Sequence, residues 1–439
     1  MKRSRGSALL ATLCFAAVLS LSLSSYLAVC YRSLVLSNRS IHSSHSIELA
    51  EVGMEEALWA LNNTGGFDGT WSHPIAADAT KTLSGFMYEN GATGQVTVTV
   101  ADYATPAPKI TAIGRITLGD HTTIMRILQS YARPAPLFTK AIGATGNLAF
   151  DFGGTVDSYN SAIGGYSPTD PAHLTAANSA AVISAPDVTL GATTQIYGFA
   201  VTNSPTVMDP NPFLSASGAK LIGPDSAVAI DPSRRRTNFS LPIYDPVDPP
   251  GGSSIPAVTT STTLSSAGVY RVDSINLTTD SVNPLIGAEL LITAPVVLVV
   301  SNSVQTSGLG QITIRGAGSL ELQIEENDGY GLVLQGAGIV NETALPQNLS
   351  VIVGGSYGGN PTSSIDVTND FYGSIYLPHD AVTIGNNTTI FGALIAKTIS
   401  FTGASPSFHY DSAFQNISIT YINAPFTLTQ LRELSSTGT

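Results

Sequence analysis

The first 31 residues constrain the fold of this chain more than any other stretch. Ser7 to Tyr31 contains no charged side chain, no Pro and no Gly, and it follows directly on Lys2, Arg3 and Arg5. A run of this length and composition is typical of a helix that crosses a lipid bilayer. Basic residues before the span favour a cytoplasmic N-terminus and export of the rest of the chain.

The helical pattern continues beyond the apolar run. No Pro occurs before Pro74, and Gly53 is the only Gly between Ser7 and Asn62. We therefore predict one transmembrane and amphipathic helix over residues 7–62, roughly 80 Å long at 1.5 Å per residue. One apolar stripe at helical spacing marks its exported part: Ile47, Ala50, Met54, Ala57, Leu58 and Leu61.

The composition indicates a β-rich protein outside the cytoplasm. Only 11% of the 439 residues are charged, Gly numbers 41, and the net charge is −12. The mean hydropathy is +0.20. Eight of the 19 Lys and Arg residues follow Ala141, so the exported part lacks the basic surface that nucleic acid requires. We expect no nucleic-acid partner.

Both cysteines, Cys14 and Cys30, lie inside the apolar run. The rest of the chain can therefore form neither a disulfide nor a thiolate metal site. Leu27 to Cys30 has the outline of a lipoprotein cleavage box, but Val29 is larger than that position tolerates. A secretory signal peptide would need a shorter apolar core and a small-residue cleavage site. An ordinary uncleaved signal anchor stays open as an alternative.

Two segments, RGSALL at residues 5–10 and ELAEVGMEEAL at residues 48–58, resemble the N-terminal region of PilX-type minor pilins, members of the type IV pilin and pseudopilin superfamily. The resemblance covers about the first 62 residues. It implies that residues 1–6 form a basic leader, that prepilin peptidase cuts after Gly6, and that Ser7 becomes the new N-terminus. It also implies that the helix packs with other pilin subunits in a filament. The residues that would face membrane or filament are Leu9, Leu10, Ala11, Leu13, Phe15 and Leu19.

Ala11 departs from the pattern of most major pilins, which carry Glu at this position, five residues into the mature chain. In the family that carboxylate is thought to neutralise the terminal amine of a neighbouring subunit, and an unpaired carboxylate in lipid is costly. Because minor and tip pilins tolerate its loss, Ala11 favours a minor or tip role.

After the predicted helix, the spacing of the apolar residues changes from the helical period to alternation at every second residue. Residues 96–100 alternate Val with Thr, and the segments 110–117 and 122–131 follow with turn residues between them. The pattern predicts a small antiparallel β-sheet within residues 63–132. The Pro-rich segment 133–138 reads as a stiff linker.

Short apolar strands recur after this linker. Their starts, at residues 296, 320, 349, 373 and 393, are 24, 29, 24 and 20 residues apart. With no helical pattern between them, this spacing predicts a right-handed parallel β-helix, a solenoid in which each coil stacks on the next. We assign it to residues 139–420, with long loops near 205–266 and a C-terminal tail over 421–439. The whole chain is thus expected to be mainly β.

Four short segments support that assignment by resemblance. VDSYNS at 156–161, GVYRV at 268–272, GIVN at 338–341 and FHYD at 408–411 look like the β-helical ectodomain found downstream of PilX-type N-termini. The resemblance implies an architecture and no particular activity.

Parallel β-helices also house polysaccharide lyases and hydrolases, which need clustered carboxylates. Here the candidate groups are scattered singly along the chain, and Glu325 to Asp328 reads as a solvated acidic turn. The single candidates are Asp366, Asp370, Asp380, Arg315 and Lys397. We therefore expect no enzyme activity, no catalytic residue and no cofactor.

Histidine is scarce, with seven residues in the chain. His409 next to Tyr410 and Asp411 could be a base with an orienting acid, but neighbouring strand positions face opposite sides of a sheet. A structural, hydrogen-bonded end cap is favoured. His42, His45 and Glu48 lie along one helix stripe and do not converge easily on a metal ion, so we expect no metal site.

Two other features could bind a ligand. Arg234, Arg235 and Arg236 form the only dense basic run and could contact an acidic glycan, although a solvated loop is the simpler reading. Aromatic residues that precede Gly could stack on sugar rings. At regularly spaced positions of a solenoid, however, stacking of the aromatic side chains on one another in the interior is favoured. These aromatic residues are Tyr197, Tyr372 and Phe391.

Together these patterns favour a structural minor pilin or pseudopilin-like subunit of a type IV pilus or type II secretion-like filament. Its role would be assembly, priming or tip adhesion. The expected location is the bacterial inner membrane, with a single pass, or the cell surface after assembly into a filament. The expected partners are other pilin subunits, the inner membrane, prepilin peptidase and a surface glycan. The alternative is a signal-anchored extracytoplasmic protein that binds or cleaves polysaccharide.

Overall fold

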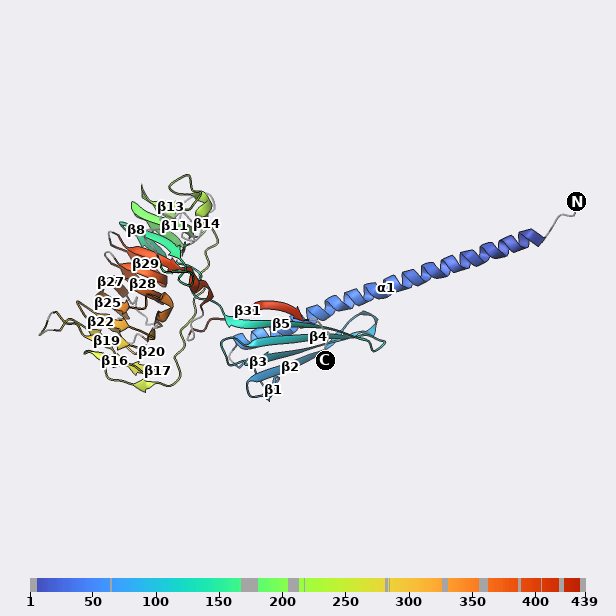
Figure 1. Ribbon diagram of the computed structural model, residues 1–439, viewed down its shortest axis with the longest axis horizontal. Coiled ribbons are helices and arrows are strands. Elements are labelled where there is room, and N and C mark those ends of the chain that lie inside the picture. Colours follow the sequence, from blue (N-terminus) through green and yellow to red (C-terminus); the bar gives the residue numbers. More distant parts are fainter. Residues whose placement is uncertain are drawn as a thin grey trace. The chain divides into compact units, whose positions relative to one another are not determined.

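The computed structural model describes residues 6–63, 65–166, 181–203, 213–216, 218–280, 283, 285–325, 331–354, 362–385, 388–403, 405–417 and 422–434. The chain forms two compact units. The first contains residues 1–135 and 425–439, and the second contains residues 136–424. The second unit is thus an insertion into the first (Figure 1).

One long helix, α1 (Gly6–Asn62), dominates the first unit, which confirms the predicted N-terminal helix. Its second half lies on a β-sheet, where Ala50, Met54 and Ala57 are buried. The contact is close because strand β4 (Lys109–Thr117) carries Gly114: a Cβ atom there would lie 2.0 Å from the carbonyl oxygen of Ser46. The Ser46 hydroxyl in turn donates to the Gly114 carbonyl oxygen at 2.8 Å.

The sheet of the first unit has six antiparallel strands in the order β1-β2-β3-β4-β5-β31. Alternation along β3 sends Val96, Val98 and Val100 to the helix side, where they are fully buried. The last strand comes from the far end of the chain. The bounds are β1 Ser72–Ile75, β2 Asp78–Met87, β3 Thr93–Ala101, β4 Lys109–Thr117, β5 Thr123–Pro134 and β31 Phe426–Leu434, with a 3-10 turn at Glu89–Gly91.

The second unit is built from parallel strands in one 21-stranded sheet and one four-stranded sheet of order β16-β19-β22-β25. Its early strands are β6 Ile142–Ala144, β7 Asn147–Phe150, β8 Gly153–Tyr159, β9 Ala181–Ser184, β10 Asp187–Leu190, β11 Thr193–Val201, β12 Phe213–Ser215, β13 Lys220–Ile222, β14 Arg235–Arg236, β15 Ser253–Ser254 and β16 Thr262–Leu264. Its middle strands are β17 Gly268–Val272, β18 Ile275–Leu277, β19 Glu289–Ile292, β20 Pro295–Val300, β21 Val304–Thr306, β22 Gln311–Ile314, β23 Ser319–Ile324, β24 Leu332–Gly336 and β25 Gly338–Asn341. Its late strands are β26 Leu349–Val353, β27 Thr362–Val367, β28 Phe371–Ile384, β29 Thr389–Phe401 and β30 Ser407–Asp411, and 3-10 turns lie at Pro232–Arg234, Pro346–Asn348 and Ser412–Asn416.

A continuous apolar column runs through the large sheet. Each of its residues is paired in parallel register with the next and has no exposed surface. Stacking of branched aliphatic side chains on neighbouring strands removes this surface from water and stabilises the unit. The column is Leu298, Leu322, Val351, Ile375, Leu394, Ile142 and Ile183.

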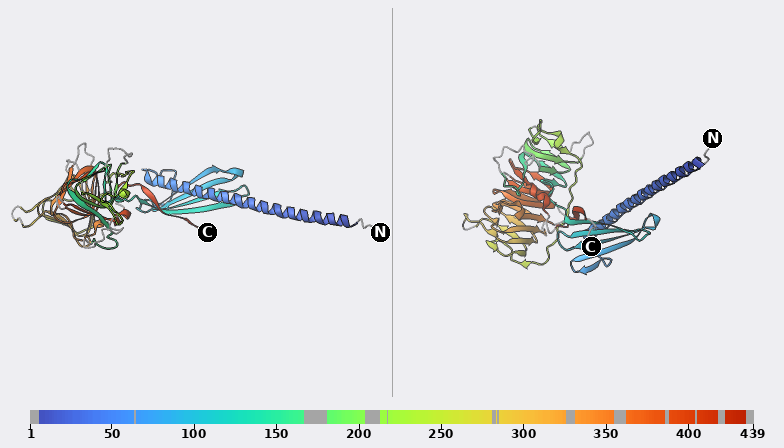
Figure 2. Two further views of the ribbon diagram at one scale, coloured as in Figure 1. Left: turned by 90° about the horizontal axis from the view of Figure 1, so that it is seen from above. Right: turned by 45° about the vertical axis from the view of Figure 1, so that its right-hand side comes forward.

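The order of that column shows that the predicted right-handed β-helix solenoid is wrong. In such a solenoid each coil stacks on the next along the chain, but here β29 pairs with β28 and also with β6 and β30. Strands β6, β9, β11, β8, β30 and β29 form a closed ring of six parallel pairings, to which the other strands are added. Figures 1 and 2 show the late strands β28 and β29, in red, between the green early strands and the yellow and orange middle strands.

Candidate functional site

The first half of α1 is apolar and unburied. No residue in the most apolar window of the helix is buried, and the helix is long and apolar enough to cross a membrane. Leu13 is 70% exposed and Leu19 54%. Figure 1 shows α1 running on past the sheet of the first unit. Of the remaining predicted membrane and filament residues, Gly6 begins α1, Leu10, Ala11 and Phe15 are exposed, and the side chains of Ser7 and Leu9 lie outside the described residues.

A ladder of four side chains crosses one face of the second unit. The register of strands β28, β29, β30 and β8 places Tyr372, Phe391, His409 and Asp157 side by side. The Tyr372 and Phe391 rings stack with centroids 4.4 Å apart and planes 6° apart. The His409 ring continues the stack, 4.7 Å from Phe391. These spacings match the distance between neighbouring strands, so the parallel register itself aligns the rings.

The ladder ends in a buried acid-histidine pair. Nδ1 of His409 lies 2.6 Å from Oδ1 of Asp157, and the carboxylate has no exposed surface. The Tyr166 hydroxyl donates to the other carboxylate oxygen at 2.8 Å, and its ring lies over His409 with centroids 4.0 Å apart. Burial, with Asp157 nearby, raises the pKa of Tyr166, so this hydroxyl stays protonated and keeps donating. A buried carboxylate is tolerable when it is paired in this way.

The predicted hydrogen-bonded role of His409 thus has a partner that the sequence did not suggest. Asp411, the acid near it in sequence, instead accepts hydrogen bonds from the backbone and hydroxyl of Ser161, at 3.0 and 2.5 Å. Asp157 and Tyr166 were missed. The sequence signal that could have indicated them is the pair of polar-aromatic segments at 156–161 and 408–411. These segments lie on the neighbouring parallel strands β8 and β30.

A cavity of about 430 Å³ opens beside this ladder. Tyr159, Tyr166, Tyr372, Phe391 and His409 form its ring-bearing wall. Its other polar lining groups are Ser161, Asp370 and Thr389. Tyr159 is 8% exposed, and its hydroxyl has no hydrogen-bond partner among the described residues. Burial raises the pKa of Tyr159, so its hydroxyl is neutral at physiological pH.

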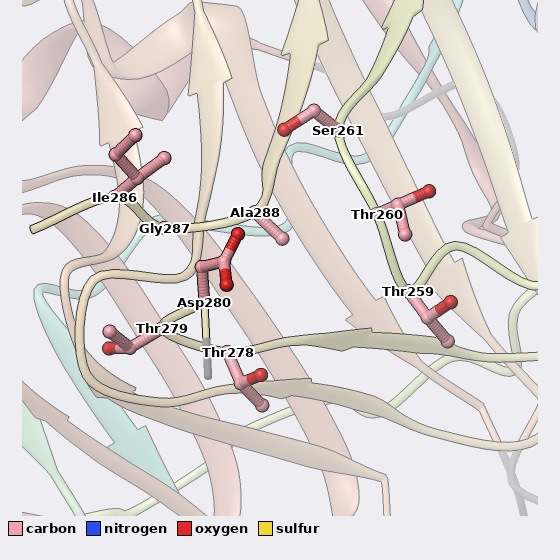
Figure 3. Close-up of a pocket in the computed structure, with 9 residues that line it drawn as sticks. All are labelled: Thr259, Thr260, Ser261, Thr278, Thr279, Asp280, Ile286, Gly287 and Ala288. Atoms are coloured by element: carbon pink, nitrogen blue, oxygen red, sulfur yellow. The ribbon is translucent and has the colours of Figure 1, made fainter. Parts of the chain in front are cut away.

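A second cavity of about 430 Å³ lies at the turn between β18 and β19. Figure 3 shows hydroxyl groups around it from Thr259, Thr260 and Ser261 on one segment and Thr278 and Thr279 on another. Asp280 is the single carboxylate among its lining residues, which include no aromatic ring and no histidine. The aromatic cavity combines a flat apolar wall with a buried ionisable pair, so we take it as the candidate binding site.

The basic run has a structural role in the fold. The guanidinium carbons of Arg234 and Arg236 lie 4.8 and 3.9 Å from the centroid of the Phe199 ring. Arg234 also donates to the carbonyl oxygen of Gly198 at 3.2 Å. These contacts fix two of the three arginines against β11, and glycan binding by Arg234, Arg235 and Arg236 stays a prediction.

The other carboxylates that the sequence offered do not form one site. Asp380 is buried and accepts from the Ser363 hydroxyl at 2.8 Å, while Arg315 forms two 2.6 Å hydrogen bonds with Glu342. Within the described residues no group of three or more His, Cys, Asp or Glu side chains could hold a metal ion. Residues 326–328 of the predicted acidic turn, and Lys2, Arg3 and Arg5 of the leader, lie outside the described residues.

Comparisons with known proteins give a limited assignment. Residues 247–417, less than half of the chain, match a family model described as "Domain of unknown function (DUF7305)". No curated protein matches this chain. Among solved structures, the chain is similar to a crystal structure of the competence-associated pilin ComZ from Thermus thermophilus, at 12% identity and a TM-score of 0.31. That match covers 89% of this chain and 97% of the other, but at this score it supports no assignment of fold or function.

Proposed function

We propose that this protein is a membrane-anchored structural subunit of the minor pilin type, which carries its second unit outside the membrane. One observation carries the proposal: α1 is a single 57-residue helix whose first half offers unburied apolar side chains while its second half forms part of a folded core. Exposed apolar surface on this scale indicates a lipid or protein partner. The PilX-like segments at residues 5–10 and 48–58 support the same assignment.

The proposed mechanism follows from the order of features along α1. The basic residues before Ser7 hold the N-terminus in the cytoplasm while the apolar run enters the inner membrane. Prepilin peptidase then cuts after Gly6, and the freed helix packs beside other pilin helices. Ala11 brings no carboxylate into that assembly, which favours a position at the tip or an early role in assembly over one along the shaft.

Mass spectrometry of the N-terminus tests this proposal. Full-length protein is expressed with and without a prepilin peptidase, together with the variant Gly6→Leu. We expect a chain that begins at Ser7 only when the peptidase is present and Gly6 is intact. The variant Ala11→Glu serves as a matched control that should still be cut. An intact Met1 in the presence of an active peptidase would contradict the proposal.

The second candidate function is an anchored protein that binds or cleaves polysaccharide. The aromatic cavity with its His409–Asp157 pair favours it. Cleavage would release new reducing or unsaturated ends from a neutral polysaccharide, and this release would vanish in the variant His409→Ala. Since Asp157 has no exposed surface and is engaged by both His409 and Tyr166, we propose a binding role without catalysis.

A further inference from the structure

A connection without regular secondary structure, residues 237–252, joins β14 to β15, and we call it the strap. Figure 1 shows β14 near one end of the second unit, while β17, the partner of β15, lies near the other. The strap is packed on the unit that it crosses, because Leu241, Ile243 and Tyr244 contact its apolar core. At Gly143 on β6, a Cβ atom would lie 3.0 Å from both δ carbons of Leu241. This connection is therefore part of the folded unit rather than a solvated loop.

The strap covers an apolar column on the outer face of the large sheet. Ile352, Tyr376 and Ile395 pair in parallel register and have no exposed surface. Alternation along their strands places them on the face opposite the apolar column described above. Strap residues 246–248 line a small cavity of about 150 Å³ together with Ile352. Without its cover this outer column would be exposed to water, which costs free energy in proportion to its apolar area.

One buried tyrosine holds the middle of the strap on this outer column. The Tyr376 hydroxyl accepts a hydrogen bond from the Tyr244 N–H and donates one to the Tyr244 carbonyl oxygen, both at 2.8 Å. Burial raises the pKa of Tyr376 to about 12, so the hydroxyl keeps the proton that it donates. The far end of the strap is held separately, where Arg271 on β17 donates to the carbonyl oxygens of Pro249 and Gly251 at 2.6 and 2.8 Å. Loss of the Tyr376 contact would therefore free the middle of the strap while its far end stays attached.

The same part of the strap holds the segment by which the chain leaves the second unit. This exit segment, residues 422–424, directly precedes the point at which the first unit resumes. The Asn423 N–H donates to the Asp245 carbonyl oxygen at 3.0 Å, and Ile422 opposes Pro246 in an isolated antiparallel bridge. Release of the strap therefore also removes a backbone partner of the exit segment.

We propose that strap residues 241–246 and the exit segment form a latch, which opens and closes as one unit while the parallel sheets stay folded. The latch is held by a tyrosine hydroxyl and one short antiparallel contact instead of a continuous hydrogen-bond ladder. Segments held in this way open at a lower free energy than the core of a sheet. The strap cannot form such a ladder, because four of its residues have no N–H to donate: Pro242, Pro246, Pro249 and Pro250.

Opening of the latch would expose an apolar surface that is hidden in the closed state. It would also release the chain that leads into β31 from its contact with the strap. The latch involves neither the N-terminal half of α1 nor the aromatic cavity, so it does not rest on the membrane anchor or on ligand binding.

Native-state hydrogen exchange of the full-length protein in detergent tests the proposal. Exchange would be followed by mass spectrometry at increasing urea concentrations below the unfolding transition. We expect the amides of residues 243–245 and 422–424 to share one opening free energy and one denaturant dependence, both smaller than those of the amides of β23. Different values for the two segments, or values equal to those of β23, would overturn the proposal.

The variant Tyr376→Phe tests the contact that closes the latch. It keeps the buried ring and removes only the hydroxyl that binds the Tyr244 backbone. We expect exchange to become about tenfold faster in both segments, because hydrogen bonds are lost, and to stay unchanged in β23. Tyr197→Phe is the matched control, since its part-buried hydroxyl donates to Oε1 of Gln195 on the same strand at 2.9 Å. Unchanged exchange in the strap, faster exchange in the strap alone, or equally faster exchange in β23 would each contradict a latch that opens as one unit.

Discussion

At the scale of single residues, the buried pair of Asp157 and His409 contributes to the stability of the second unit. Asp157 has no exposed surface and receives hydrogen bonds from His409 and Tyr166. Changing Asp157 to Ala would leave the buried His409 and the half-buried Tyr166 hydroxyl without their acceptor. We expect the free energy of unfolding of the second unit to fall by about 3 kcal/mol.

Calorimetry of the full-length protein measures this loss. Both tryptophans, Trp59 and Trp71, belong to the first unit, so their fluorescence should not respond to the change. The control is Asp187→Ala, which removes an exposed carboxylate on β10 and should change stability by less than about 0.5 kcal/mol. Equal effects of the two variants would contradict the structural role assigned to Asp157.

A second residue links stability to pH. Burial raises the pKa of Glu321 on β23 above its ordinary value of 4.5, against the lowering effect of a hydrogen bond from Gln323. The folded state therefore holds this proton more tightly than the unfolded state, and stability falls as pH rises from about 4.5 through the raised value. Glu321→Gln should raise the melting temperature at pH 7, and this gain should disappear below pH 4. If the variant still melts at a higher temperature below pH 4, the charge of Glu321 is not the cause of the gain.

These residues also show where sequence reasoning fails at this scale. The sequence favours a structural role for His409, but its partner Asp157 lies 252 residues away in the chain. The pairing depends on β8 and β30 being neighbours in one register. Alternation along each strand indicates which residues share a face, and it carries no information about which other strand lies alongside.

At the scale of elements, α1 was predictable because its cause is local. The composition predicts the apolar run, and the absence of Pro, with Gly53 as the only Gly between Ser7 and Asn62, predicts its continuity to Asn62. The strand order of the second unit was not predictable in this way. The spacing of its strands suggested coils stacked in sequence, whereas β29 pairs with β6 and β30 with β8. Parallel strands of similar apolar composition can stack in several orders, and only the long-range packing selects one.

The contact of α1 with its sheet gives a prediction for the element. At Gly114 a Cβ atom would lie 2.0 Å from the Ser46 carbonyl oxygen and 2.8 Å from the Ala50 nitrogen, both backbone atoms of the helix. Gly114→Ala should push α1 off the sheet and lower the free energy of unfolding of the first unit by about 1–3 kcal/mol.

Tryptophan fluorescence during denaturation reports this loss, since Trp71 is buried in the first unit. Gly119→Ala is the matched control, because its Cβ atom would meet only the Asn90 carbonyl oxygen, at an ordinary 3.5 Å. If Gly114→Ala unfolds at the same denaturant concentration as the control, the prediction that α1 packs too closely on β4 to admit a Cβ atom is contradicted.

At the scale of the whole molecule, the chain passes twice between the two units, after Ala135 and before Pro425. These two points are neighbours in the first unit: the Ala135 nitrogen donates to the Pro425 carbonyl oxygen at 2.8 Å, and Pro134 pairs with Phe426. Strand β31 is further held by Asn62, whose side chain exchanges two hydrogen bonds with the Phe426 backbone, at 3.1 and 2.6 Å. The first unit is therefore completed by the C-terminal strand after the whole second unit has been inserted.

This arrangement predicts that the second unit can be removed without unfolding the first. Residues 136–424 would be replaced by Asn-Gly, since neighbouring antiparallel strands can be joined by a two-residue turn. The shortened protein should keep a buried Trp71 and unfold in one cooperative step. A companion deletion of residues 425–439 from the full chain should instead expose the edge of β5 and lower the stability of the first unit. If the excised protein is unfolded while the companion is stable, β31 does not complete the first unit, and the two units depend on each other for folding.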